Sequence, residues 1–261
     1  MRSHKKRPLS DPGQYAARRG AVAIAPFPRL PPLPLHKQPT WPVYGWSLRD
    51  SCRRSRATAA AWLALVCSGE LCHWKEKRGG FYQHDTHLPL ICSFLDAVRV
   101  RLVSGSEQLG RDMLREQGVD PSSLQLAGLK LVRMETGEGE QEIHYDITEH
   151  EQAQQCFTVL LYLAPTLSTA VPSLPLAELR ETFAAGENRP PPAALARLTR
   201  QMFYSARVEA GDAMLFRCDV PHYGVANPDA QTRCVAFMMF SPRGSPTPDT
   251  EEQRYPHGVV D

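Results

Sequence analysis

The sequence of 261 residues predicts an α+β protein, with helices in the first half of its folded part and strands in the second. Apolar residues recur at helical spacing between residues 57 and 118. They alternate, or run continuously, between residues 124 and 242. No repeat of fixed period is visible. An all-strand second half with long loops favours a sandwich or barrel over a parallel sheet.

Three helices are expected before residue 120. The alanine-rich segment 57–74 places Leu and Trp three to four residues apart, as on one face of a helix. Segment 88–105 has the same spacing and ends at Gly105, and segment 105–118 ends at Gly118. Glycine is typical of the residue just past a helix end, so each segment is predicted as a separate helix.

Strands are expected after residue 123, because the apolar period shortens from helical spacing to two. A proline-rich insertion over 165–206 interrupts them and carries a predicted helix over 193–204. A turn is expected at "GEGE", residues 137–140. The predicted strands are 124–134, 141–147, 155–165, 207–218 and 232–242.

The N-terminal segment differs from the rest in charge. Residues 1–56 hold 12 of the 30 Lys and Arg residues but only two of the 28 Asp and Glu residues, which gives net charges of about +10 there and about −8 elsewhere. Residues 1–42 also hold nine of the 23 prolines. Because proline fixes φ and removes a donor, we predict a disordered tail over 1–56 and one folded domain over 57–261. Within that domain, 57–120 supplies helical support and 121–242 the strand core.

Several roles for the tail stay open. "RLPPLPL" is typical of ligands of SH3 domains, although its arginine lies one residue out of the usual register. "HKKRP" is typical of a nuclear signal, and the basic, acid-poor composition is typical of a mitochondrial leader. A solvated, unstructured tail requires none of these roles.

Cysteine usage and hydropathy indicate where the protein works. The seven cysteines are odd in number and scattered, which favours reduced thiols inside a cell over a disulfide framework. No run approaches the ~18–20 apolar residues of a membrane span. We therefore expect an intracellular protein, cytoplasmic or nuclear, with the mitochondrion as an alternative.

One short pattern suggests metal chemistry. His144 and Asp146 lie two positions apart in the predicted strand 141–147, so their side chains share a face. A second histidine would complete a two-histidine, one-carboxylate set, which binds Fe(II) and leaves coordination positions open. His222 is the candidate, because it follows "GDAML" (211–215), a Gly-Asp turn that leads into an apolar strand.

The basic residue Arg233 follows His222 by 11 positions, at the start of the last predicted strand. "HYD", a long gap, "HYGVANPDAQTR" and the preceding "GDAML" together resemble the 2-oxoglutarate- and Fe(II)-dependent dioxygenases. "TVLLYLAP" after the HxD strand resembles their prolyl-4-hydroxylase-like branch. The match covers about residues 120–242, and it is the order and spacing of the pieces, rather than any single piece, that make it specific.

The resemblance implies a fold and a site. It implies a double-stranded β-helix, or jelly-roll, core with the N-terminal helices packed on the sheet. His144, Asp146 and His222 match the iron ligands, and Arg233 matches the residue that holds the distal carboxylate of 2-oxoglutarate, a role that suits a planar, permanently charged group. Tyr162 matches a tyrosine that hydrogen-bonds the same carboxylate. Thr158 lies four residues earlier on the same strand face, so we expect it to line the pocket.

The implied activity is oxygenation. The resemblance implies Fe(II) as the metal and 2-oxoglutarate and O2 as co-substrates, with ascorbate as an additional candidate, and hydroxylation of a substrate with release of succinate and CO2. A protein side chain is the first candidate substrate and a small metabolite the second. The acidic body disfavours nucleic acid, since phosphate contacts need a basic surface.

The sequence also departs from the family. Cys234 and Val235 replace the usual x-Ser after the arginine, and Met134 stands where relatives often carry a tyrosine. The insertion over 165–206 replaces a glycine-rich stretch. These differences weaken the substrate assignment and leave the iron and co-substrate positions in place.

Two alternatives stay open. One is a zinc site, although its cysteine spacing is wider than structural zinc sites favour, so buried inert cysteines are the simpler interpretation. The other is a non-catalytic jelly-roll scaffold that recruits SH3-type partners through its tail. The candidate zinc ligands are Cys67, Cys72, His73, His84 and His87.

Overall fold

The computed structural model describes residues 46–50, 52–67, 75–77, 81–85, 93–137, 139–147, 150–175 and 200–245. All of them belong to one compact unit, Pro39–Asp261. The predicted features of residues 1–45, including the SH3-type and nuclear-signal sequences, lie outside the described residues.

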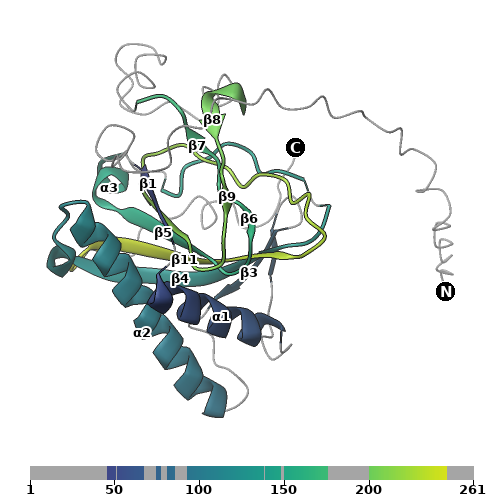
Figure 1. The fold of residues 1–261 in the computed structure, drawn as a ribbon. Coiled ribbons are helices and arrows are strands. Elements are labelled where there is room, and N and C mark those ends of the chain that lie inside the picture. Colours follow the sequence, from purple (N-terminus) through teal and green to yellow (C-terminus); the bar gives the residue numbers. More distant parts are fainter. Residues whose placement is uncertain are drawn as a thin grey trace, which may run out of the picture. The chain divides into compact units, whose positions relative to one another are not determined.

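A seven-stranded sheet forms the centre of this unit (Figure 1), and every hydrogen-bonded pair of neighbours in it runs antiparallel. The antiparallel pairing agrees with the expected sandwich or barrel and not with a parallel sheet. In spatial order, the strands are β1 (Trp46–Arg49), β10 (Ala213–Arg217), β5 (Phe157–Tyr162), β11 (Arg233–Pro242), β4 (Leu124–Met134), β3 (Phe81–Asp85) and β2 (Lys75–Lys77).

The described structure begins earlier than residue 57. β1 pairs with β10, with Leu48 opposite Met214, and helix α1 begins at Arg53. Residues 46–49 and 53–56 were expected in the tail. A four-residue strand shows too few alternations to be recognised in the sequence, and its position depends on pairing with β10, 160 or more residues away.

Helices α1 (Arg53–Cys67) and α2 (Ser93–Glu116) lie across one face of the sheet (Figure 1). The prediction of two helices that meet at Gly105 is wrong, because α2 is continuous through this residue. A Cβ added to Gly105 would lie 3.4 Å from the Thr58 hydroxyl oxygen of α1. The glycine therefore marks a close approach of two helices and not a helix end.

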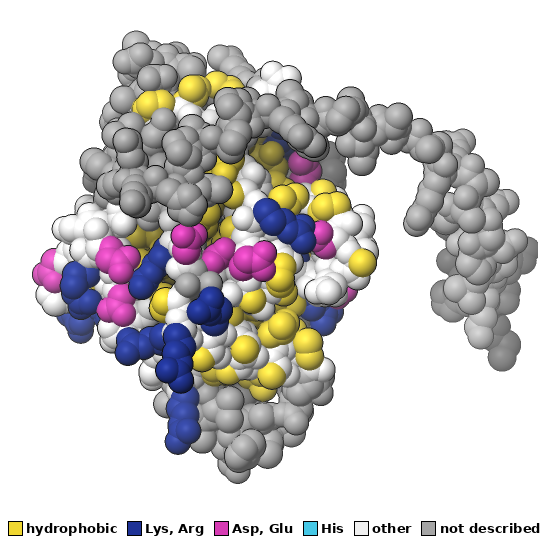
Figure 2. All heavy atoms as spheres, viewed as in Figure 1, with side chains coloured by type: hydrophobic (Ala, Val, Ile, Leu, Met, Phe, Trp, Pro, Cys, Tyr) yellow, Lys and Arg dark blue, Asp and Glu magenta, His cyan; other side chains and the backbone are white. Residues whose placement is uncertain are grey.

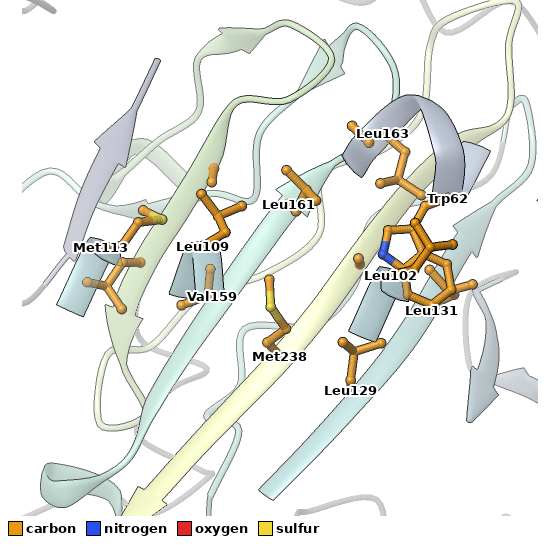
Figure 3. Close-up of a cluster of buried hydrophobic side chains, with 14 of the residues drawn as sticks. Trp62, Leu102, Leu109, Met113, Leu129, Leu131, Val159, Leu161, Leu163 and Met238 are labelled. Atoms are coloured by element: carbon orange, nitrogen blue, oxygen red, sulfur yellow. The ribbon is translucent and has the colours of Figure 1, made fainter. Parts of the chain in front are cut away.

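An apolar core fills the space between the helices and the sheet. Trp62 of α1 is 1% exposed, and its indole nitrogen donates a 2.9 Å hydrogen bond to Ser106 of α2. Figure 3 shows side chains from α1 and α2 meeting side chains from the sheet there. Each such large side chain contributes about 1.5–3 kcal/mol by burial. The labelled members are Trp62, Leu102, Leu109, Met113, Leu129, Leu131, Val159, Leu161, Leu163 and Met238.

A second, discontinuous layer lies on the other side of the sheet. It consists of β6 (Thr166–Leu167) paired with β9 (Arg207–Val208), and β7 (Val171–Pro172) paired with β8 (Phe203–Tyr204). Single bridges join His144 to His222 and Ala170 to Tyr223. The short helices are η2 (Pro121–Ser123), α3 (His150–Gln155) and η3 (Arg200–Met202).

Two elements predicted from the sequence differ from the structure in this layer. Segment 141–147 was expected as a strand, but it forms only isolated bridges, at His144 and at Ile147. Its polar residues hydrogen-bond with loops, so the segment does not form a continuous strand ladder. Of the predicted helix 193–204, residues 193–199 lie outside the described residues, and the rest forms η3 followed by β8.

Strand alternation separates the two faces of the sheet. In β5, Val159 and Leu161 belong to the core beneath the helices. Leu160 and Tyr162 belong to a second apolar cluster toward the discontinuous layer, and Thr158 points the same way by alternation. The candidate site is built on this second face. Within the described residues, no helix is long and apolar enough to cross a bilayer.

Candidate metal centre

A backbone bridge brings the two histidines together. His144 and His222 exchange both backbone hydrogen bonds, each with an N···O distance of 2.9 Å. Residues paired directly across two strands point to the same side. The imidazole rings accordingly lie side by side, with centroids 4.5 Å apart.

Hydrogen bonds determine which ring nitrogens face the centre. Nδ1 of His144 lies 2.9 Å from the Glu142 carbonyl oxygen, and Nδ1 of His222 lies 3.0 Å from that of Val220. A carbonyl oxygen only accepts, so we assign the proton of each neutral ring to Nδ1. Each Nε2 then keeps its lone pair, which is the arrangement of a metal-binding imidazole.

Asp146 supplies a carboxylate to the same place. Its Oδ1 lies 3.5 Å from Nε2 of His222, and its side chain is 9% exposed. Burial alone would raise the pKa of the Asp146 carboxyl. The positive charge that His222 and His144 carry when their rings are protonated, and the Thr158 hydroxyl, which donates to Oδ2, oppose burial and hold this pKa below its usual value. The carboxylate is therefore ionised at neutral pH.

The three side chains form a compact set of ligand atoms. One atom each from His144, Asp146 and His222 lies within 4.8 Å of the other two. A carboxylate oxygen and two imidazole nitrogens that each carry a lone pair repel one another unless a cation, or protons on the rings, lies between them. The donor set of two nitrogens and one oxygen suits Fe(II) and related divalent ions.

Apolar residues surround this set. The Phe216 ring lies 4.6 Å from the His222 ring, between centroids. Ile147, Cys218 and Met239 belong to one buried cluster, and Cys218 lies beside Thr158, the hydrogen-bond partner of Asp146. An apolar environment excludes water and strengthens the attraction between a bound cation and its ligands.

Arg233 is the first residue of β11, where it pairs with Met134. By alternation its side chain shares a face with Val235, toward the second cluster, and the residue is 6% exposed. Burial lowers the pKa of the Arg233 guanidinium more than Tyr162 and Asp229 raise it. The group still carries its charge at neutral pH, since a free guanidinium titrates far above this range.

Tyr162 is fully buried beside Arg233. Its hydroxyl accepts a 2.9 Å hydrogen bond from the Thr169 backbone N–H and lies 3.9 Å from the Met214 sulfur. Burial raises the pKa of Tyr162, so the phenol stays neutral. A role for Tyr162 or Thr158 in binding a co-substrate stays a prediction, as does that of Arg233.

Asn227 is a structural residue of the site that the motifs did not indicate. Its amide nitrogen donates to the carbonyl oxygens of Met134, Glu135 and Gln231 at 3.2, 3.3 and 2.9 Å. These bonds join the loop between His222 and Arg233 to the end of β4. The only sequence signal was "NPD", a turn-forming triplet.

The alternative zinc ligands are not brought together by the described residues. Cys67 is exposed at the end of α1. Cys72, His73 and His87 lie outside the described residues, as does the side chain of His84.

Comparisons with known proteins show where this fold occurs. No protein-family model matches the sequence, and no curated protein matches it. Among solved structures, the α-ketoglutarate-dependent carbocyclase SnoK from nogalamycin biosynthesis has a TM-score of 0.56 at 14% identity, over 82% of this chain and 86% of that one. The α-ketoglutarate-dependent epimerase SnoN has a TM-score of 0.53 at 14% identity, over 76% and 78%.

The chain has the fold of these α-ketoglutarate-dependent enzymes. HygX from Streptomyces hygroscopicus, solved with nickel, 2-oxoglutarate and hygromycin B, has a TM-score of 0.50 at 11% identity, over 78% and 86%. SnoN has been solved with Fe³⁺ and α-ketoglutarate. The expected jelly-roll core of this fold is thus confirmed, whereas the prolyl-4-hydroxylase-like branch stays a prediction.

Proposed function

We propose that the protein is an Fe(II)- and 2-oxoglutarate-dependent oxygenase. The observation that carries this proposal is the convergence of His144, Asp146 and His222 within 4.8 Å. Their protonation pattern leaves three lone-pair atoms facing one another, and the fold is that of enzymes named as α-ketoglutarate-dependent. A facial set of three ligands leaves the opposite coordination positions open for a co-substrate and O2.

Arg233 would hold the distal carboxylate of 2-oxoglutarate. It is a buried cation on the same face of the sheet as Thr158 and Tyr162, and β11 lies directly beside β5. A planar guanidinium offers two parallel N–H groups to a carboxylate, and such charge-assisted bonds are the stronger ones. The neutral phenol of Tyr162 would line the pocket beside the charged Arg233 guanidinium.

The proposed chemistry is oxidation of a C–H bond. When bound, iron and 2-oxoglutarate would supply the oxidising power, with O2 consumed and succinate and CO2 released, and ascorbate would serve to keep the iron reduced. The chain's own residues hold the metal, bind the co-substrate and exclude water. Hydroxylation is the simplest outcome, but the neighbours named epimerase and carbocyclase show that this fold also serves other outcomes.

A small organic metabolite is the substrate class that the comparisons favour. SnoN and SnoK act in nogalamycin biosynthesis, and HygX has been solved with hygromycin B. A protein side chain, the first expectation from the sequence, rests on the prolyl-4-hydroxylase-like pattern alone. Nucleic acid is not proposed, since Lys and Arg side chains are interspersed with Asp and Glu on the face shown in Figure 2.

An anaerobic titration tests the proposal without knowledge of the substrate. Fe(II) and 2-oxoglutarate are added to the full chain, and the visible metal-to-ligand charge-transfer absorption is recorded. The band should form with the wild-type protein and be absent from Asp146→Ala and His222→Ala. Both variants should also lose succinate formation under air. A wild-type protein that shows no band would favour the non-catalytic scaffold.

A further inference from the structure

The second carboxylate oxygen of Asp146 has a partner of its own. Oδ1 faces His222, whereas Oδ2 accepts a hydrogen bond from the Thr158 hydroxyl. The Asp146 side chain is 9% exposed and Thr158 is fully buried. A buried carboxylate oxygen without a donor is costly, so the hydroxyl both satisfies Oδ2 and fixes the rotation of the carboxylate.

Thr158 is in turn oriented by Cys218. The Thr158 oxygen lies 3.4 Å from the Cys218 sulfur. A hydroxyl has a single proton, and Thr158 donates this proton to Asp146. Toward Cys218 the hydroxyl therefore accepts, and the thiol is the donor. The result is a directional chain of hydrogen bonds from Cys218 through Thr158 to Asp146.

This chain joins an irregular segment to the rigid sheet. Asp146 lies in a segment that forms isolated bridges at His144 and Ile147 instead of a continuous strand. Thr158 lies within β5, opposite Phe216 of β10, and Cys218 extends the same pairing by donating its backbone N–H to Cys156 at 3.0 Å. The paired strands β5 and β10 thus determine where the Asp146 carboxylate points.

We propose that Thr158 is a positioning residue of the metal centre, and that Cys218 orients its hydroxyl. By engaging Oδ2, Thr158 leaves Asp146 one oxygen, Oδ1, for the metal ion. The inference rests on the proposed function, since it requires a divalent ion at His144, Asp146 and His222. It gives Thr158 a role distinct from the expected lining of the co-substrate pocket.

Binding of Co(II) alone to the full chain tests this role. Thr158→Val keeps the shape of the side chain and removes the hydroxyl, whereas Thr158→Ser keeps the hydroxyl. Loss of a partner to a metal ligand typically weakens metal binding by about 10–100-fold. We expect that loss, together with altered Co(II) d–d absorption, in Thr158→Val and near wild-type values in Thr158→Ser. Thermal unfolding without metal separates a folding defect from a binding defect.

The outcomes distinguish this inference from the proposed function. Co(II) affinity and absorption in Thr158→Val equal to those of the wild type, with binding lost in Asp146→Ala, would overturn the role of Thr158 alone. A wild-type protein that binds no Co(II) would overturn both. For Cys218, we expect Cys218→Ala to weaken binding less than Thr158→Val, and the double variant to bind no more weakly than Thr158→Val. Additive losses, or no effect of Cys218→Ala, would overturn the role of Cys218.

Discussion

Two backbone carbonyl groups, those of Glu142 and Val220, set the chemistry of the candidate centre at the scale of single residues. Each accepts a hydrogen bond from Nδ1 of the histidine two positions later. The same i to i+2 relation on both sides of the bridge gives both imidazoles the same tautomer and the same direction. The pair is therefore preorganised, and a metal ion would not need to reorient either ring.

Arg233 allows a first prediction. Arg233→Gln removes a buried charge from the face that carries the site, so 2-oxoglutarate should lose a charge-assisted contact of about 1.5–3 kcal/mol, or roughly ten- to a hundredfold in affinity. Calorimetric titration of the Mn(II)-loaded protein with 2-oxoglutarate measures this loss. Mn(II) affinity serves as the control and should stay at the wild-type value. Unchanged 2-oxoglutarate affinity would remove Arg233 from the site.

The cysteines allow a second prediction. Burial raises the pKa of Cys156 and of Cys234 to about 12, whereas the Ser55 backbone N–H lowers the pKa of Cys52, which lies just before α1. Since the thiolate is the reactive form, Cys52 should react with iodoacetamide at pH 8 while Cys156 and Cys234 stay unmodified. Mass spectrometry of peptides from the native protein reads this out. Equal labelling of all three would contradict the packing described above.

At the scale of single residues, the sequence predicts the metal ligands but not the residues that hold these ligands in place. His144, Asp146 and His222 were predictable because a two-residue period places the first two on one face and the spacing to Arg233 is distinctive. The shared face of Thr158 and Tyr162 also followed from alternation. The bonds from Thr158 to Asp146 and from Asn227 to three carbonyl groups join segments whose pairing no local pattern encodes.

At the scale of elements, helix α2 shows how glycine is used to approach the sheet. A Cβ added to Gly110 would lie 2.5 Å from two atoms of the Phe240 ring, which is fully buried in β11. Nearby, Arg111 lies with its guanidinium carbon 5.9 Å from the centre of the same ring. The absence of a side chain at Gly110 therefore permits contact between α2 and β11.

A third prediction compares two glycines in α2. Gly110→Ala should destabilise the protein by about 1–3 kcal/mol, because the new methyl group overpacks against Phe240. Gly105→Ala is the matched control. Its methyl group would meet the Thr58 hydroxyl oxygen at 3.4 Å and the Thr58 methyl carbon at 3.8 Å, so the higher helix propensity of alanine should prevail, with a gain of up to about 1 kcal/mol. Urea unfolding measures the stability of both variants. A Gly105→Ala variant that is less stable than Gly110→Ala would contradict the contact between Gly110 and Phe240.

The element predictions failed where local signals were ambiguous. The sequence predicts a helix end at Gly105, whereas this residue lies inside α2, beside Thr58 of α1. Segment 141–147 alternates like a strand but forms only isolated bridges. Strand β1 is recognisable only through its partner β10, because four residues carry too little pattern. The long strands β4, β5 and β11, whose apolar patterns are extended, fall close to their predicted ranges.

At the scale of the whole molecule, the central sheet separates two tasks. One face packs against α1 and α2 and supplies the core (Figure 3), and the other carries the polar and charged residues of the site. A metal ion on the second face would join segments that are up to 78 positions apart, from His144 to His222. Such an ion should therefore stabilise the folded chain as a whole.

Metal-linked stability is the fourth prediction. An ion that binds only the folded state stabilises it by about 2.7 kcal/mol at a concentration of 100 Kd. For a chain of this size that corresponds to a rise in Tm of roughly 5–10 °C. Calorimetry with Mn(II), reversed by a chelator, measures the shift, and Asp146→Asn provides the control. An equal rise in Asp146→Asn would place the ion elsewhere.

The X-ray absorption spectrum of the Fe(II)-loaded full chain tests the central claim most directly, because it counts the ligands of the bound ion. We predict scattering from two imidazole rings and from nitrogen and oxygen ligands only, with one imidazole lost in His222→Ala. Sulfur in the first coordination shell, or a spectrum that is the same in the wild type and His222→Ala, would contradict a metal centre built by His144, Asp146 and His222.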